Sequence, residues 1–162
     1  IAAVDCVSTP NPQFREIALA SLQEADIFFV NEIEAGWILH HDVTPSNAES
    51  SVRELVDLGA RGIVVLHFAE GAVAYNPEDA SVIAQGAVKV PSEKIIGASG
   101  AGDAFATGFL VGVHEEWPLG RSLECAVCVA AQSLKHPSPS DGITSLEACL
   151  LLGSSLSYRA FP

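Results

Sequence analysis

The sequence predicts an α/β fold organised around a mainly parallel sheet. Three short, mostly apolar runs have the length and composition of strands, at residues 1–7, 25–30 and 61–66. Stretches with apolar residues at helical spacing separate them, and this alternation implies βαβ units with parallel strands. A loop of small residues at 97–102 then runs straight into another helical stretch, which is typical of an anion site.

Most helices have a recognisable start or stop. The turn at 8–12 can begin a helix that carries apolar residues as far as Leu22, and 31–39 is a strand-to-helix junction. Pro45 can begin another helix, which Gly59 ends. Three further helices are expected after the glycine loop: one to about His114, one from Pro118 or Leu119 to about Gln132, and one that starts at 144–147.

The segments between and after these helices are less regular. Residues 71–75 and 81–90 look like two strands joined by the polar turn 76–79, and we expect them to form an antiparallel edge of the sheet. The final stretch, 153–162, carries no strong pattern. The chain begins at Ile1 and contains no Met, so we expect a piece of a longer protein.

Composition fits one globular domain and restricts the function classes. The 162 residues are 49% hydrophobic, enough for a substantial core. A net charge of −12 with only 8 Lys and Arg argues against nucleic-acid binding. An ATP site is compatible with this charge, because backbone amides and Mg²⁺ supply local positive charge. No apolar run approaches the ~20 residues of a membrane helix, and no signal peptide is visible, so we expect a cytoplasmic protein with no membrane partner.

Cys125 and Cys128 form a lone C-x₂-C pair within an apolar helical stretch. The other two cysteines, Cys6 and Cys149, do not complete a second pair at the spacing of a zinc finger. We therefore interpret the thiols as small buried hydrophobic groups, not as a metal or redox site.

The glycine loop combines an anion site with a carboxylate. Gly100 and Gly102 have no Cβ, so a ligand can reach their backbone amides, and the next helix adds unpaired N–H groups. Asp103 follows in the first turn. Because phosphate repels a carboxylate, the pairing indicates a base that accepts a proton from a hydroxyl attacking the phosphate. The alternative is that Asp103 only caps or complements the helix terminus.

Two more junctions follow predicted strands, where open α/β sheets bind ligands. Asn31 and Glu34 lie one helical turn apart and offer oxygen ligands to Mg²⁺, directly or through water. The alternative is a capping box, in which Asn31 caps the helix and Glu34 is its partner. The turn from His67 and Phe68 to Gly71 could pass over a nucleotide, or it is an ordinary connection.

In these motifs the chain resembles the ribokinase family of carbohydrate kinases, also called the PfkB family. Three segments carry the resemblance, which runs over essentially the whole chain. Residues 99–109 closely follow the family signature D-T-x-G-A-G-D-x-F-x-x-G-F, and residues 31–34 match its N-x-x-E motif. Residues 64–72 lie where members have a V-V-T-L-G-x-x-G-A segment.

The resemblance implies a ribokinase-like, three-layer α/β/α fold, incomplete at its N-terminal side, with 1–162 as the C-terminal, ATP-side part of the kinase domain. It implies ATP-dependent phosphorylation of a hydroxymethyl group on a sugar or a similar small alcohol. The roles that it assigns are general base for Asp103, anion hole for the amides of Gly100, Ala101 and Gly102, Mg²⁺ site for Asn31 and Glu34, and nucleotide side for Ser99, His67, Phe68 and Gly71.

Three departures from the family pattern bear on this reading. Gly97 stands where members usually carry an acid of a monovalent-cation site, which puts activation by K⁺ in question. His67 and Phe68 alter the nucleotide segment, and Val127 stands about where an Asn often lies near the adenine. They motivate the alternative of a non-catalytic member that binds a nucleotide or sugar. A nucleoside kinase is a further alternative.

The resemblance also implies what this chain lacks. In the family, most sugar-binding residues and a lid that excludes water lie in the N-terminal half. We therefore expect the chain alone to be a poor kinase. The implied partners are a small-molecule sugar or nucleoside and, through the lid, a second copy in a homodimer; neither nucleic acid nor a membrane is expected.

Overall fold

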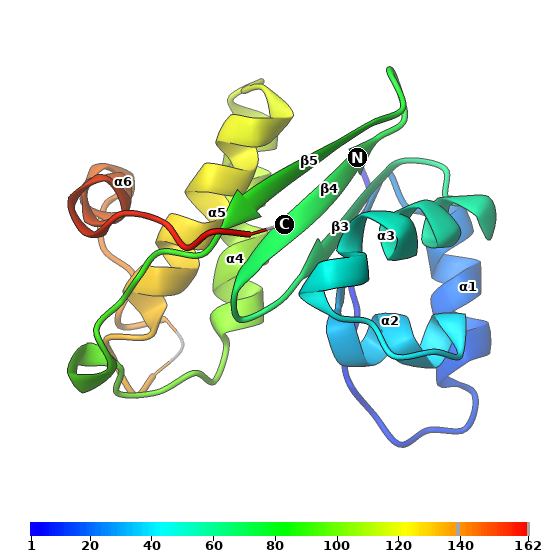
Figure 1. Cartoon of the computed structure of the whole chain (residues 1–162), viewed down its shortest axis with the longest axis horizontal. Coiled ribbons are helices and arrows are strands. Elements are labelled where there is room, and N and C mark those ends of the chain that lie inside the picture. The colour runs from blue at the N-terminus through cyan, green and yellow to red at the C-terminus, as the bar shows by residue number, and fades with distance from the viewer. Residues whose placement is uncertain (139, 162) are drawn as a thin grey trace. The chain divides into compact units, whose positions relative to one another are not determined.

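A computed structural model describes residues 1–138 and 140–161, which form an open α/β fold (Figure 1). Its five strands make one mixed sheet in the order β1-β2-β3-β4-β5, and β1, β2 and β3 run parallel. The strands are β1 (Ala3–Asp5), β2 (Ile27–Asn31), β3 (Ile63–His67), β4 (Gly71–Asn76) and β5 (Ser81–Gly86). The predicted α/β class with its parallel strands is therefore confirmed.

The helices begin and end close to the predicted positions. They are α1 (Phe14–Glu24), α2 (Glu32–Leu39), α3 (Ala48–Asp57), α4 (Ala101–His114), α5 (Leu119–Ser133) and α6 (Leu146–Leu156). Two short 3₁₀ helices, η1 (Pro45–Asn47) and η2 (Ser92–Lys94), precede α3 and α4. Among the described residues, no helix is both long and apolar enough to span a membrane.

The chain forms two compact units. The first comprises Ile1–Phe68 and Val73–Ile83, and the second comprises Ala69–Ala72 and the described residues of Ala84–Phe161. In the first unit β2 and β3 are continuous apolar strands whose central side chains are buried, as in a parallel sheet covered on both faces. Helices α1, α2 and α3 belong to this unit (Figure 1).

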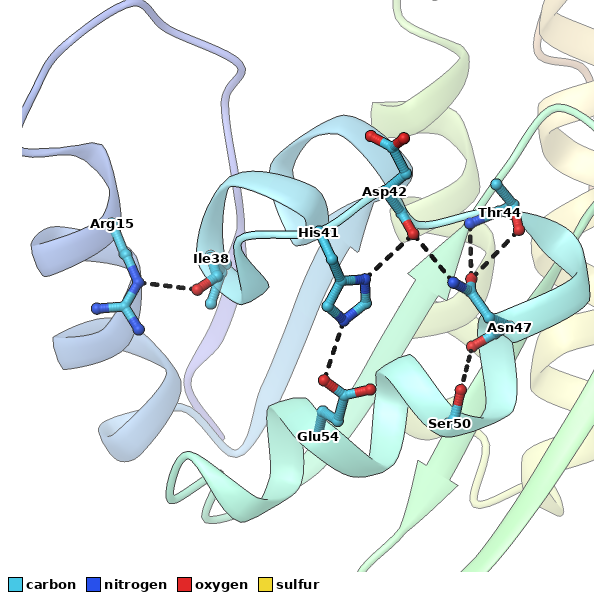
Figure 2. A network of polar contacts seen from close by, with 8 residues as sticks. All are labelled: Arg15, Ile38, His41, Asp42, Thr44, Asn47, Ser50 and Glu54. Atoms are coloured by element: carbon cyan, nitrogen blue, oxygen red, sulfur yellow. Dashed lines mark hydrogen bonds and ion pairs between the residues drawn. The ribbon is translucent and has the colours of Figure 1, made fainter.

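A polar network fixes the connection between α2 and α3 in the first unit (Figure 2). The His41 imidazole lies 3.1 Å from the carbonyl oxygen of Asp42 and 3.0 Å from Glu54 Oε2. Asn47 Nδ2 donates to the same carbonyl at 3.0 Å. On the other side, Arg15 Nε donates to the carbonyl of Ile38 in the last turn of α2. The C-terminal end of α2 is thus held from both α1 and α3.

In the second unit α4 and α5 pack closely because a glycine lies at their contact. A Cβ added at Gly108 would lie 2.9 Å from the Cα of Ala126. Helix α6 packs on α5. Beyond the end of α6, the Tyr158 hydroxyl lies 3.5 Å from Cys128 Sγ of α5. Cys125, Cys128 and Cys149 are buried and free, so their interpretation as buried thiols is confirmed, whereas Cys6 is free but only half-buried.

The last part of the chain is more ordered than its sequence indicates. Helix α6 continues to Leu156, although 153–162 carries no strong pattern. The following segment pairs with residues 87–89: the Arg159 amide donates to the Ala87 carbonyl at 2.8 Å, and the Lys89 amide donates to the Ser157 carbonyl at 3.1 Å. The order comes from backbone bonds to a distant segment, which a local pattern does not reveal.

Candidate functional site

In the first unit, β2 and β3 end side by side with polar residues. Asn31 is the last residue of β2, His67 is the last residue of β3, and the two are register partners in the parallel ladder. The sheet thus brings together the predicted Mg²⁺ residues and the first residue of the predicted nucleotide segment. This is the carboxyl edge, where open α/β sheets bind ligands.

Asn31 and Glu34 form the capping box that was the alternative interpretation. Asn31 Oδ1 accepts hydrogen bonds from the amides of Ile33 and Glu34, at 3.0 and 2.9 Å. Glu34 Oε2 in turn accepts from the Asn31 amide at 3.0 Å. Because a carboxamide oxygen has two lone pairs, the cap occupies both acceptor positions of Asn31 Oδ1. Only the Glu34 carboxylate keeps acceptor capacity for a cation.

The Glu34 carboxylate is a buried anion. The residue is 2% exposed, and its second oxygen, Oε1, accepts from the Ser8 hydroxyl at 2.8 Å. Among the described residues, no Lys, Arg or His forms an ion pair with it. Buried charges are normally paired or bound to a metal, and carboxylate oxygens are ligands that Mg²⁺ prefers. The donor chemistry of this site therefore fits a divalent cation.

Ser8 was not among the residues picked out from the sequence. It follows β1, and its hydroxyl contacts both Glu34 and Asn31, since Asn31 Nδ2 lies 3.4 Å from Ser8 Oγ. Its position in the sequence could have identified Ser8 as a candidate. It is a hydroxyl just past the end of a strand that neighbours the one ending at Asn31.

Of the predicted nucleotide segment, His67 and Phe68 belong to the first unit and Gly71 belongs to the second. Burial lowers the pKa of the His67 imidazole to about 4, so the ring is neutral at pH 7. Phe68 is buried at 9% exposure. Gly71, in the second unit, lies so close to the Gln85 carbonyl that an added Cβ would be 2.5 Å from it. Close backbone packing in β4 is therefore a sufficient reason for this glycine.

The glycine loop belongs to the second unit and opens α4 as expected. Gly100 has φ +75°, the left-handed region, and stands at the N-cap of the helix. The Ala101 amide donates to the Ala98 carbonyl at 3.2 Å. The amides of Gly102 and Asp103 donate to no partner within the part of the chain that the structure describes. These free donors are the ones that an anion at a helix N-terminus would use.

The Asp103 side chain is exposed in the first turn of α4. It makes no capping hydrogen bond within the described residues, so it is not the side-chain cap of the helix. As an acid in the first turn it still complements the positive end of the helix, which is the other half of the alternative interpretation. Thr107, one turn later, donates its hydroxyl proton to the Asp103 carbonyl oxygen at 2.7 Å. Among the described residues, no hydrogen bond or ion pair engages the Asp103 carboxylate. Ser99, just before the loop glycine, is exposed as well.

The segment before the glycine loop is attached to the end of α5. The amides of Ile96 and Gly97 both donate to the Leu134 carbonyl, at 2.8 and 3.3 Å. A Cβ at Gly97 would meet the His136 carbonyl oxygen at 3.4 Å, an ordinary contact. A Cβ therefore fits at this position, so packing does not require a glycine here.

Comparison with known proteins identifies the family of this chain. The model of the pfkB family of carbohydrate kinases matches residues 2–146. The chain belongs to this family. A 5-dehydro-2-deoxygluconokinase of Geobacillus kaustophilus is 23% identical to this pfkB-family chain over 124 residues, which are 76% of this chain and 36% of that protein.

Solved structures show the same fold. The ribokinase of Arabidopsis thaliana complexed with ribose and ATP matches with a TM-score of 0.76 at 20% identity, over 93% of this chain and 46% of that one. The adenosine kinase of Schistosoma mansoni in complex with 2-fluoroadenosine matches with a TM-score of 0.70 at 22% identity, over 90% and 44%. The predicted ribokinase-like fold is thus confirmed. This pfkB-family chain spans less than half the length of these relatives.

Proposed function

We propose that the chain is the ATP-side part of a kinase that phosphorylates a hydroxymethyl group of a sugar or a similar small alcohol. The observation that carries this proposal is the glycine loop. Two amides at the start of α4, which have no partner among the described residues, stand next to the exposed carboxylate of Asp103. Donors for a phosphoryl group and an acceptor for a proton are the two functions that phosphoryl transfer to an alcohol needs.

Asp103 is the general base in this mechanism. Its carboxylate takes the proton from the substrate hydroxyl while that oxygen forms a bond to the γ-phosphorus and the bond to the ADP oxygen breaks. The amides of Gly100, Ala101 and Gly102, with the N-terminus of α4, stabilise the negative charge on the transferring phosphoryl group. The Ala101 amide must leave the Ala98 carbonyl to take part.

Glu34 is the residue that would hold Mg²⁺, directly or through water. When bound, the ion would neutralise phosphate charge. Asn31 acts in this proposal mainly by holding the carboxylate, because its own side-chain oxygen is engaged in the cap. On the nucleotide side we assign Ser99, His67, Phe68 and Gly71. Gly97 offers no carboxylate for a monovalent cation, so we propose a reaction that K⁺ does not activate.

The sugar-binding half of the kinase lies, in this proposal, in a longer chain. Within the described sheet β1 is an edge strand, and an open apolar hollow of about 480 Å³ lies beside it. Val4 of β1 and Ile17 of α1 line this hollow, and Ile17 is 54% exposed. We assign this surface to a further strand and helix from the preceding half of the same polypeptide. The 162 residues alone are then a poor kinase.

The test is Asp103→Asn in the full-length protein, assayed for ATP-dependent phosphorylation across a panel of sugars and nucleosides. Loss of the general base lowers the rate by ~10²–10⁴-fold. Glu115→Gln, an exposed carboxylate at the other end of α4, is the matched control and should leave the rate unchanged. An unchanged rate in Asp103→Asn would reject the role of the base. No turnover of any alcohol by the wild type would favour a non-catalytic binding protein.

A further inference from the structure

We propose that Ser8 is a positioning residue for the Glu34 carboxylate, and that its hydroxyl sets how tightly the site holds a divalent cation. This inference rests on the proposed function, because it takes Glu34 as the metal-binding side chain. Ser8 lies outside the three family motifs (residues 31–34, 64–72 and 99–109) and is not part of the capping box.

The position of Ser8 follows from the sheet. Strands β1 and β2 are parallel neighbours with Asp5 opposite Phe29, and the ladder continues one residue further, since the Cys6 amide donates to the Phe29 carbonyl at 3.1 Å. The chain beyond Cys6 therefore leaves the sheet beside the residue that caps α2. Ser8 reaches the carboxylate from the loop after β1, 26 residues away in the sequence.

The hydrogen bonds around Ser8 have a defined direction. A serine hydroxyl has one proton, and Ser8 Oγ gives it to Glu34 Oε1 at 2.8 Å. Toward Asn31, 3.4 Å away, it acts as the acceptor for the amide nitrogen Nδ2. The resulting chain runs from the Asn31 side chain through the Ser8 hydroxyl to the Glu34 carboxylate, so one hydroxyl connects the cap to the anion.

Ser8 holds the one carboxylate oxygen that the capping box leaves without a donor. The Asn31 amide fixes Oε2, whereas Oε1 has the Ser8 hydroxyl. The terminal torsion of a Glu side chain is broad, so a single bond to Oε2 does not fix the plane of the carboxylate. When the Asn31 amide holds Oε2 and the Ser8 hydroxyl holds Oε1, the plane of the carboxylate is fixed. The lone pairs that remain for a cation then point in one direction. Hydrogen bonds of this kind to metal ligands typically change metal affinity by ~10–100-fold.

The experiment uses the full-length protein with four variants: Ser8→Ala, Ser8→Thr, Glu34→Gln and the control Thr9→Ala. Thr9 lies in the same loop, and its hydroxyl accepts only a long bond from the Asn11 amide, 3.4 Å, among the described residues. Binding of Mn²⁺ is measured by electron paramagnetic resonance with the β,γ-methylene analogue of ATP, without turnover. In parallel, the Mg²⁺ concentration for half-maximal activity is compared with kcat at saturating Mg²⁺. Amide exchange at Ile33 and Glu34 reports on the cap.

We expect Ser8→Ala to weaken Mn²⁺ binding, and to raise the half-maximal Mg²⁺ concentration, by about 10-fold or more. Its kcat at saturating Mg²⁺ should stay close to that of the wild type. Ser8→Thr restores the hydroxyl and should recover affinity, and Thr9→Ala should have no effect. Exchange at Ile33 and Glu34 should remain slow in Ser8→Ala, because Asn31 makes the cap without Ser8.

The outcomes separate the two levels of the proposal. If Glu34→Gln weakens Mn²⁺ binding and Ser8→Ala does not, the metal role of Glu34 stands and the inference about Ser8 is wrong. The inference is also wrong if Ser8→Thr fails to recover affinity, or if Thr9→Ala loses as much. If the wild type binds no Mn²⁺ with the analogue, both fall. If Ser8→Ala behaves as expected but Asp103→Asn retains full activity, the inference stands and the proposed catalytic base is rejected.

Discussion

In the first unit the polar groups of Asn31, Glu34 and Ser8 are bonded to one another, whereas in the second unit the amides of Gly102 and Asp103 donate to no described partner. In the first cluster the donors are paired within the cluster, and only lone pairs of the buried Glu34 carboxylate remain to bind a ligand. Within the described residues the glycine loop keeps two free donors, which in our proposal bind the phosphoryl group. Substitutions in the first cluster should therefore act on stability and metal affinity, and substitutions in the loop should act on turnover.

The largest effect after loss of the base is expected at Gly100. Gly100→Ala puts a side chain at φ +75°, where L residues are disfavoured, so the loop shifts and its amides lose their alignment. We expect kcat/KM of the full-length protein to fall by about 10²-fold, as when one donor of an oxyanion hole is lost. Steady-state kinetics with the best sugar substrate measures this.

Gly59→Ala is the matched control for Gly100→Ala. Gly59 also has a positive φ, +104°, but it lies just beyond the end of α3, and its added Cβ makes only ordinary contacts with Gln23. Both variants should lose a similar amount of stability, about 1 kcal/mol. Only Gly100→Ala should lose turnover. Equal kinetics for the two variants would mean that the loop does not contact the phosphoryl group.

The sequence predicts the glycine loop better than the Glu34 site because the conformation of the loop depends on residues that are close together in the sequence. Gly100, Gly102 and Asp103 are within four residues, and their conformation depends on local backbone freedom and on the start of one helix. Local signals likewise predict the end of α4 near His114 and the start of α6 within residues 144–147. Each of these features is determined by neighbours in the sequence.

The features that sequence reasoning missed depend on distant partners. Ser8 acquires its role only when β1 lies beside β2, and the tail after Leu156 is ordered only when Arg159 reaches Ala87. At Asn31 and Glu34 the sequence left two interpretations open, because a capping box and a metal site use the same residue types at the same spacing. The structure establishes the cap, and it leaves the buried charge of Glu34 as the argument for the metal.

The next largest effect is expected on the stability of the first unit, at Asn31. Asn31→Ala removes the acceptor of the Ile33 and Glu34 amides and the side-chain contact to Ser8. We expect a loss of about 1 kcal/mol in the free energy of unfolding, within the ~0.5–2 kcal/mol range for N-caps. Chemical denaturation of the full-length protein measures it.

Ser145→Ala serves as the control for Asn31→Ala. Ser145 caps α6, where its hydroxyl oxygen accepts from the Ala148 amide at 3.3 Å. It should cost a comparable amount of stability and leave Mn²⁺ binding unchanged, whereas Asn31→Ala should weaken Mn²⁺ binding as well. If Asn31→Ala and Ser145→Ala had the same effect on stability and neither changed Mn²⁺ binding, Asn31 would act only as a helix cap.

The smallest effect is expected at the opposite end of α2, where His41 joins α3 (Figure 2). A hydrogen bond to the Asp42 carbonyl, and a second one to Glu54, raise the pKa of His41 above its ordinary value. The folded protein then binds this proton more tightly than the unfolded chain. The stabilisation is fully present below the unfolded pKa of about 6.5 and is lost as the pH rises through the folded pKa. Because the side chain is exposed, solvent screens the interaction and the effect is small.

Glu54→Gln should therefore lower the Tm at about pH 5.5 and leave it nearly unchanged at about pH 8.5, where an imidazole is neutral. Glu49→Gln is the control on the same helix. It breaks the exposed pair with Arg53, 3.1 Å long, whose guanidinium does not titrate in this range, so its effect should be equal at both pH values. An equal loss for Glu54→Gln at both pH values would contradict the charge-based role of His41. Since His41 holds only the C-terminal end of α2, neither variant should alter Mn²⁺ binding at Glu34, in contrast to Asn31→Ala.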